Sequence, residues 1–199
     1  MKTAAMISLY DYDGWLDTIL AMHAICDHLV VRIDPRFTGS AASADEFCHD
    51  LYADSGISFD SYISTLEWNR WNWREEMLRR LDDVKPDLVL CPDEDEIFGA
   101  GLADDIAAFM DSDKLGMMFA YHAPLPTADG AVLFDGKPYP GLPHMKAFKW
   151  REGLTYEDYT GFARVTNYVD KGCHYHAKTQ IWHYCCWSPE QRETHEMKW

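Results

Sequence analysis

Short apolar runs and stretches of helical spacing alternate along the first part of the chain. Residues 3–10 (TAAMISLY) form an apolar run that predicts a strand, and the acidic sequence 11–14 (DYDG) predicts a loop after it. From Trp15 onward, positions 16, 19, 20, 23 and 24 share one face at helical spacing, which predicts a helix. Residues 29–33 (LVVRI) predict a second strand. The order strand, helix, strand predicts parallel pairing with a right-handed crossover.

The same two periodicities predict further elements along the rest of the chain. The helix over 69–83 has the clearest pattern, because Trp73, Met77 and Leu81 line one side. Residues 123–143 are rich in Pro and Gly, which predicts hairpins or an ordered loop. The remaining predicted elements are a loop over 38–44, helices over 45–54 and 101–110, a short strand within 57–66, and strands over 88–91, 115–121 and 145–150.

The chain is centred on residues 85–97, where the apolar run 88–91 (LVLC) leads into the four acids 93–96 (DEDE). Prolines at 86 and 92 confine the run, which suits a buried strand. The acids then lie beyond the carboxyl end of this strand, where open α/β sheets bind ligands. Four adjacent carboxylates repel one another, and a bound Mg²⁺ or Mn²⁺ would cancel that repulsion. The alternatives are a solvated acidic loop, or acids that favour the N-terminus of the following helix.

Composition narrows the class of protein. The 199 residues are 47% hydrophobic, which suits one globular domain, and no linker or repeat divides them. The 33 acids and 18 bases give a net charge of -15, which argues against binding to a nucleic-acid backbone. No apolar run is long enough to span a bilayer, and the first residues do not form a signal peptide. Six cysteines without a disulfide framework indicate reduced thiols and a cytoplasmic protein.

The order of these segments resembles that of the family 2 glycosyltransferases with a GT-A fold, in a small bacterial or phage form. The similarity rests on 7–11 (ISLYD), 30–34 (VVRID), 72–78 (NWREEML) and 88–97 (LVLCPDEDEI), with later segments at 143–149 and 181–184. Asp93, Glu94 and Asp95 match the metal-binding DxD motif of that family. The resemblance implies an α/β fold with a mostly parallel central sheet flanked by helices, in a single compact domain over 1–199. Residues 1–122 correspond to the nucleotide-sugar-binding half and 123–199 to a reduced acceptor-side and C-terminal half.

The resemblance also assigns roles to single residues. Asp93, Asp95 and His183 are the implied ligands of a Mn²⁺ or Mg²⁺ ion. The implied donor-binding residues are Tyr10, Asp11, Asp34, Arg74, Asp93 and Glu94. Three of these residues have a plainer alternative. His183 is also compatible with a packed core histidine, Asp34 with a turn before proline, and Arg74 with a surface charge.

The implied reaction moves a sugar from a nucleotide-diphosphate sugar, a UDP-sugar in the first instance, to a hydroxyl acceptor. An inverting transfer needs a general base, and Asp158 or Glu157 in 154–159 (LTYEDY) resembles the acidic pair that supplies it. The acceptor is a glycan or another hydroxyl-bearing molecule, with a modified nucleobase still open. The alternatives are a nucleotidyltransferase, a metal-dependent phosphohydrolase, and a non-catalytic relative that binds carbohydrate or a partner protein.

The C-terminal tail holds a second group of metal-ligating residue types. Zinc is bound in proteins by four Cys or His side chains. The spacing in the tail fits no standard zinc finger, because there is no CxxC and two cysteines are adjacent. A structural zinc is therefore the less favoured reading of these residues, which are Cys173, His174, His176, His183, Cys185 and Cys186.

Overall fold

The structure is a computed structural model of the 199-residue chain. It describes residues 1–9, 15–34, 41–55, 58–65, 70–122, 125–126, 132–133, 143–159, 162–165 and 173–183. The described helices are α1 (Trp15–His23), α2 (Ala41–Ser55), α3 (Arg70–Arg80) and α4 (Leu102–Met110). None of them combines the length and the apolar character that are needed to span a bilayer.

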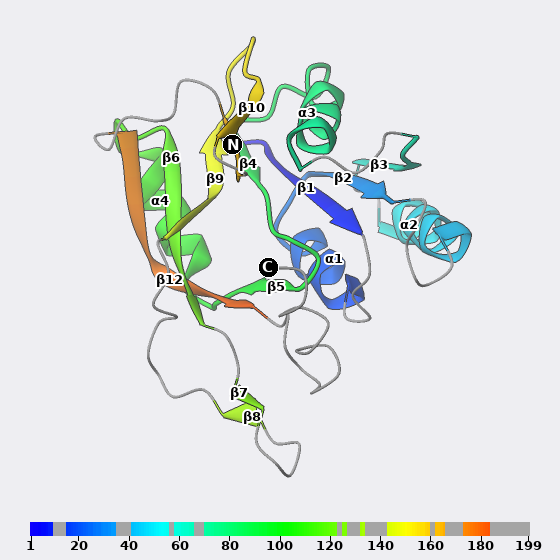
Figure 1. Cartoon of the computed structure of the whole chain (residues 1–199), viewed down its shortest axis with the longest axis horizontal. Coiled ribbons are helices and arrows are strands. Elements are labelled where there is room, and N and C mark those ends of the chain that lie inside the picture. The colour runs from blue at the N-terminus through cyan, green and yellow to red at the C-terminus, as the bar shows by residue number, and fades with distance from the viewer. Residues whose placement is uncertain are drawn as a thin grey trace.

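The described strands build one large sheet and two small hairpins (Figure 1). The strands of the large sheet are β1 (Thr3–Leu9), β2 (His28–Ile33), β3 (Ser58–Ile63), β4 (Leu88–Leu90), β5 (Glu96–Phe98), β6 (Gly116–His122), β9 (His144–Lys149) and β12 (His174–His183). Their spatial order is β3-β2-β1-β4-β9-β6-β12-β5. The hairpins pair β7 (Leu125–Pro126) with β8 (Val132–Leu133), and β10 (Tyr156–Tyr159) with β11 (Phe162–Val165).

Strand direction divides the sheet into two parts. β3, β2, β1 and β4 are parallel, as the alternation of strands and helices predicts. β9 runs antiparallel between β4 and β6, β12 is parallel to β6, and β5 is antiparallel to β12. Because β1, β2 and β4 point the same way, the residues that follow them lie along one edge of the sheet. That edge receives the acids after β4.

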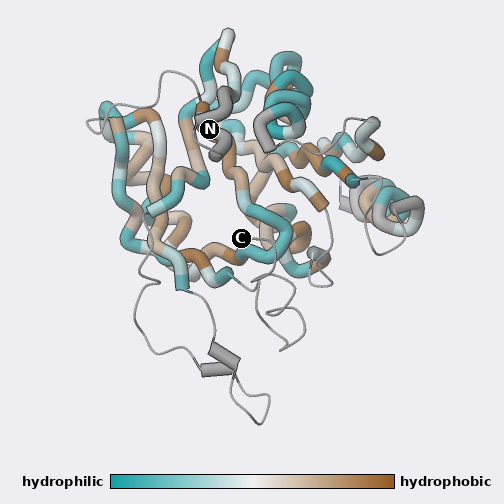
Figure 2. Tube along the Cα trace, in the orientation of Figure 1, coloured by the Kyte–Doolittle hydropathy of each residue, from teal (hydrophilic) through white to brown (hydrophobic). Residues whose placement is uncertain are grey.

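Apolar side chains on the two faces of the sheet form two cores. One core joins β1 and β2 to α1, α2 and α4, with Ile19, Cys48 and Phe109 fully buried. The other joins the opposite face to α3 and the β10–β11 hairpin, with Met77 and Leu78 buried. Figure 2 shows apolar colouring along much of β1 and β2, and hydrophilic colouring along much of α3. The helices therefore cover both faces of the sheet.

The sequence predicts most of these elements at the right places, and two kinds of difference remain. The predicted loop over 38–44 is wrong from Ala41 onward, where α2 begins. The first four residues of α2 include three alanines, the residue with the highest helix propensity, so the helix extends further toward the N-terminus than its apolar pattern. β5, β10, β11 and β12 are not among the predicted strands. The β7–β8 hairpin agrees with the hairpin expected in 123–143, most of which lies outside the described residues.

Candidate active site at the carboxyl end of β4

The acids at 93–96 follow β4 after Cys91 and Pro92, in a tight turn whose last residue, Glu96, begins β5. Leu88, Val89 and Leu90 are fully buried, so the strand is covered on both faces before the chain becomes hydrophilic. The amide of Glu96 donates to the carbonyl of Asp93 over 3.2 Å, and the amide of Asp93 donates to Oε2 of Glu96 over 2.9 Å. Residues 93–96, called the acid turn below, are therefore closed by a main-chain and a side-chain hydrogen bond.

Asp93 has a cation at each carboxylate oxygen. Arg74 on α3 donates from Nη2 to Oδ1 over 2.8 Å, and Lys146 on β9 donates from Nζ to Oδ2 over 2.6 Å. The Lys146 ammonium also lies 2.9 Å from Oε2 of Glu96. The Lys146 and Glu96 side chains are 4% and 1% exposed, whereas 39% of the Asp93 side chain is exposed. Arg74, Asp93, Lys146 and Glu96 thus form a chain of alternating charge that runs from the surface into the protein.

Charge and burial act in opposite directions on this chain. Burial alone would raise the pKa of Asp93, but Lys146 and Arg74 hold that pKa well below its usual value. Burial alone would lower the pKa of Lys146, but Asp93 and Glu96 raise it well above the ordinary value for lysine. Burial raises the pKa of Glu96. Asp93 and Lys146 are therefore both charged at neutral pH.

Asp95 and His183, which are far apart in sequence, meet at the same place. Oδ2 of Asp95 lies 3.2 Å from Nε2 of His183, and the two side chains are 15% and 27% exposed. The pairing of β12 with β5 explains this contact, because it sets His183 opposite Glu96, the residue after Asp95. The Tyr121 ring lies 5.5 Å from the His183 ring and 4.7 Å from the His144 ring, measured between centroids. Burial lowers the pKa of His144 to about 4.

A second ionic group lies at the end of β2 and contains Asp34. This residue is fully buried, and its Oδ2 lies 3.4 Å from Nη2 of Arg32, which is 1% exposed. Nε of Arg32 lies 3.5 Å from Oε2 of Glu76 on α3, and that oxygen also accepts a hydrogen bond from Ser64 over 3.0 Å. Asp34 therefore lies at the expected edge but is held inside an ion pair, and its contact with a nucleoside stays a prediction.

Arg74 is more buried than a residue on a free helix surface, and Glu94 is more buried than a residue of a solvated loop. The Arg74 side chain is 15% exposed and binds Asp93, so its reading as a plain surface charge is wrong. Glu94 is 8% exposed, and its carbonyl accepts a hydrogen bond from Thr18 of α1 over 2.7 Å. The reading of 93–96 as a solvated acidic loop is wrong for the same reason, because Glu94 and Glu96 are both buried.

The remaining predicted residues are described only in part. Tyr10 and Asp11 lie outside the described residues. Glu157 and Asp158 lie on β10, where their backbones pair with Arg164 and Ala163, and their side chains lie outside the description. The neighbouring residue Tyr156 is buried, with its hydroxyl 3.6 Å from the Cys91 thiol just before the acid turn. The β10 hairpin therefore starts beside the site, and the catalytic role of its acids stays a prediction.

Within the described residues, no group of three or more His, Cys, Asp or Glu side chains is arranged to hold a metal ion. Asp93, Asp95 and His183 are all among these described residues. Both oxygens of Asp93 are bound to cations of the protein. Cys173, His174 and His176 are also described, whereas Cys185 and Cys186 lie outside the described part of the chain. Asp95 and His183 remain a pair of metal-ligating groups, a carboxylate and an imidazole, in contact and partly exposed.

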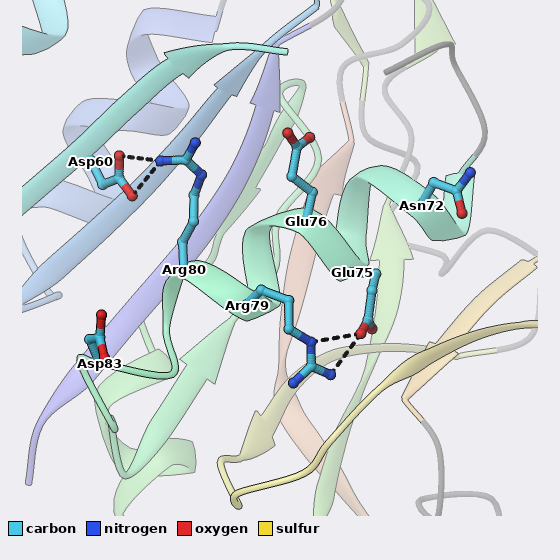
Figure 3. Close-up of a pocket in the computed structure, with 7 residues that line it drawn as sticks. All are labelled: Asp60, Asn72, Glu75, Glu76, Arg79, Arg80 and Asp83. Carbon is cyan, nitrogen blue, oxygen red and sulfur yellow. Dashed lines mark hydrogen bonds and ion pairs between the residues drawn. The ribbon is translucent and has the colours of Figure 1, made fainter. Parts of the chain in front are cut away.

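A separate groove of about 890 Å³ lies along the outer side of α3 (Figure 3). Its charged side chains largely bind one another: Arg80 donates to both oxygens of Asp60, and Arg79 donates to Glu75. Glu76 lines this groove and also reaches Arg32, so the groove backs onto the ionic group at the end of β2. A smaller hollow of about 390 Å³ lies between α4 and β12. The acid turn lines neither of these cavities.

Lys146 is the site residue that the sequence does not single out. It lies in 144–149 (HMKAFK), where strand alternation places it on the same face as Phe148. A lysine on a face that also carries a core phenylalanine needs a carboxylate partner, since lysine is almost never fully buried unless it is paired. That pattern is the signal for Lys146, and the acids at 93–96 are the partners it requires.

No protein-family model and no curated protein matches the sequence. Among solved structures, HddC from Yersinia pseudotuberculosis is similar over 100% of this chain and 99% of its own, with a TM-score of 0.52 and 11% identity. TarS from S. aureus is similar over 61% of this chain, with a TM-score of 0.47 and 17% identity, and this chain spans 36% of the TarS chain. The chain shares the fold of HddC. The predicted GT-A-like α/β fold, with a central sheet flanked by helices, is confirmed. The sheet was predicted to be mostly parallel, and it combines four parallel pairings with three antiparallel ones among the described strands.

Proposed function

We propose that this protein is a metal-dependent glycosyltransferase that uses a nucleotide-diphosphate sugar. The fold is compatible with this activity and with nucleotidyl transfer, so the site has to distinguish them. The observation that carries the proposal is the contact of Asp95 with His183 at 3.2 Å, beside Arg74 at the carboxyl end of β4. These residues come from three separate segments, each of which resembles the corresponding family 2 segment.

Asp95 and His183 fit a divalent cation, because both are partly exposed and one oxygen and one imidazole ligand suit Mn²⁺ or Mg²⁺. Such an ion usually has few protein ligands and completes its shell with substrate phosphates and water. When bound, it would stabilise the negative charge that builds up on a diphosphate leaving group. Asp93 does not fit as a direct ligand while Arg74 and Lys146 hold its oxygens.

Other residues of the chain would then bind the donor and take the proton of the acceptor. Arg74, the outermost cation of the site, is placed to meet a donor phosphate. Asp11 and Tyr10, which follow β1, and Asp34, which follows β2, are proposed to contact the nucleoside. Asp158 or Glu157 is the proposed base that takes the proton of the acceptor hydroxyl. The acceptor remains a glycan or another hydroxyl-bearing molecule.

The decisive experiment identifies the phosphate product. The full chain is incubated with Mn²⁺ and a panel of nucleotide sugars, UDP-sugars first, with and without glycan acceptors. Release of nucleoside diphosphate supports sugar transfer or donor hydrolysis, whereas nucleoside monophosphate together with sugar phosphate indicates attack at phosphorus. A parallel incubation with nucleoside triphosphates and sugar 1-phosphates tests nucleotidyl transfer, which would release pyrophosphate. Stabilisation by a nucleotide sugar without any released product would indicate a binding protein.

Two substitutions connect the product to the site. Asp95→Asn and His183→Gln are expected to reduce nucleoside diphosphate release at least about 100-fold, the size of effect seen when a group that stabilises the developing charge is lost. His176→Gln is the matched control, because His176 lies on the same strand and is exposed. Equal losses in all three variants would contradict the proposed site.

A further inference from the structure

Lys146 contacts the first and last residues of the acid turn, and the reaction proposed above assigns no role to it. Its ammonium is 2.6 Å from Oδ2 of Asp93 and 2.9 Å from Oε2 of Glu96, and its side chain is 4% exposed. The Tyr121 ring lies 5.7 Å from the ammonium, measured to the ring centroid. Beyond these groups, Arg74 faces the outer oxygen of Asp93. The ammonium is therefore enclosed by two carboxylates and one aromatic ring.

Two cations lie against two carboxyl groups in this cluster. Arg74 contacts Asp93, and Lys146 contacts both Asp93 and Glu96. The sequence suggests four adjacent carboxylates that need a divalent cation to offset their repulsion. The structure offsets two of them with side chains from α3 and β9. A buried carboxylate such as that of Glu96 is strongly destabilising without such a partner, because the charge loses its hydration.

Lys146 also fixes the shape of the acid turn. Oε2 of Glu96 accepts hydrogen bonds from both Lys146 and the amide of Asp93, so the ammonium holds the two ends of the turn together. Asp95 lies between those ends and contacts His183. If the ends separate, the carboxylate of Asp95 loses its fixed position.

We propose that Lys146 is a resident counter-ion of the acid turn and a positioning residue for Asp95. Its ammonium takes the charge-compensating place between Asp93 and Glu96, so the turn forms with Asp95 against His183 before any divalent cation binds. This role does not depend on which reaction the protein catalyses, and it can be tested without substrate.

The test is a double-mutant cycle on the full chain, measured as thermal unfolding midpoints. Lys146→Met leaves Asp93 and Glu96 uncompensated, and we expect the midpoint to fall by about 10 °C, the size of effect expected for breaking a buried ion pair in a chain of this length. Lys146→Met combined with Glu96→Gln leaves one carboxylate beside Arg74 and is expected to regain at least half of that loss. Lys149→Met is the matched control on the same strand, because Lys149 donates to the carbonyls of Met110 and Ser112. Combining it with Glu96→Gln should restore nothing.

A double variant no more stable than Lys146→Met would overturn the counter-ion role. Failure of both variants to fold would overturn it as well, since the double variant is expected to fold. Recovery of a folded double variant where Lys146→Met alone does not fold would support it.

Two further readouts separate positioning from general stability. In Lys146→Ala, the missing part of the side chain is a propylammonium ion, and this ion is expected to raise the midpoint more than sodium chloride of equal concentration. The ring resonances of His183, assigned with His183→Gln, should shift in Lys146→Met and remain unchanged in Lys149→Met. A folded Lys146→Met protein with unshifted His183 resonances would overturn the positioning role, whatever its stability.

Discussion

At the scale of single residues, partners decide what each acid can do. Asp93 and Asp95 are two positions apart, yet Asp93 binds Arg74 and Lys146 whereas Asp95 contacts His183. Asp34 is held by Arg32 in the same way that Asp93 is held by its two cations. Asp95 lies beside an imidazole instead of a cation, and its part in binding a metal ion stays a proposal.

Asp105 on α4 offers a test of this logic away from the site. Its carboxylate accepts hydrogen bonds from the amides of Lys178 over 3.1 Å and Thr179 over 2.6 Å, and from the Tyr175 hydroxyl over 3.3 Å. Burial alone would raise the pKa of Asp105, but these donors lower it below its usual value. The charged carboxylate therefore holds the irregular middle of β12, where the register to β6 shifts between His176 and Gln180.

Asp105→Asn is expected to lower the free energy of unfolding by about 1–3 kcal/mol at pH 7. Because the folded pKa of Asp105 is depressed, its stabilisation is complete above the unfolded value of 3.8 and is lost as pH falls through the folded value. The difference between the two proteins should therefore persist from pH 7 to about 5 and narrow below pH 4. Urea unfolding across this range measures it, with the neighbouring exposed residue as control in Asp104→Asn. A difference that does not narrow in acid would contradict the charged role.

At the scale of elements, the first core was predictable, whereas the strands β12 and β5 were not. β1, α1 and β2 follow from apolar runs and helical spacing because each buries a continuous apolar surface. β12 instead has mostly half-buried residues, with only Thr179 and Ile181 buried, over the polar sequence HYHAKTQIWH. It is a strand because β6 and β5 flank it. β5 is only three residues long. Pairing partners that are distant in sequence decide such strands, and a single sequence does not reveal them.

The candidate site divides in the same way. The acids and their place after β4 could be predicted, because an apolar run between prolines followed by acids has a clear local pattern. The family resemblance implies that Asp95 and His183 bind the same metal ion, and the two side chains are in contact in the structure. Lys146 and the hold of Arg32 on Asp34 depend on side chains that meet only after the sheet has formed.

Thr18 connects one of the predictable elements to the site. Its side chain is 1% exposed, and its hydroxyl lies 2.7 Å from the carbonyl of Glu94 and 3.2 Å from that of Glu96. Thr18 therefore connects α1 to the acid turn by hydrogen bonding. Thr18→Val keeps the shape but leaves these carbonyls without the donor, and we expect a loss of about 1–3 kcal/mol in the free energy of unfolding. Chemical denaturation measures the loss, and Asp17→Asn, an exposed change on the same helix, should be near neutral. Equal stability of Thr18→Val and the unaltered protein would show that α1 does not hold the turn.

At the scale of the whole molecule, the charge is distributed unevenly. The chain carries 33 acids and 18 bases, and the side chains of Arg32, Arg74 and Lys146 are largely buried against carboxylates. The surface therefore has fewer bases available to balance its acids than the composition suggests. Exposed pairs such as Arg80 with Asp60 contribute little to stability.

This imbalance predicts how stability responds to salt. Repulsion among exposed acids destabilises the folded chain, and it acts over about 30 Å at 0.01 M salt but only about 10 Å at 0.1 M. The thermal midpoint should therefore rise by several degrees between about 0.01 M and 0.2 M sodium chloride. Choline chloride should act equally, because screening does not depend on the identity of the cation, whereas an ion bound at Asp95 and His183 would favour magnesium over both. A midpoint that falls with either monovalent salt would mean that surface ion pairs outweigh the repulsion, and that the net charge of -15 does not limit the stability of this fold.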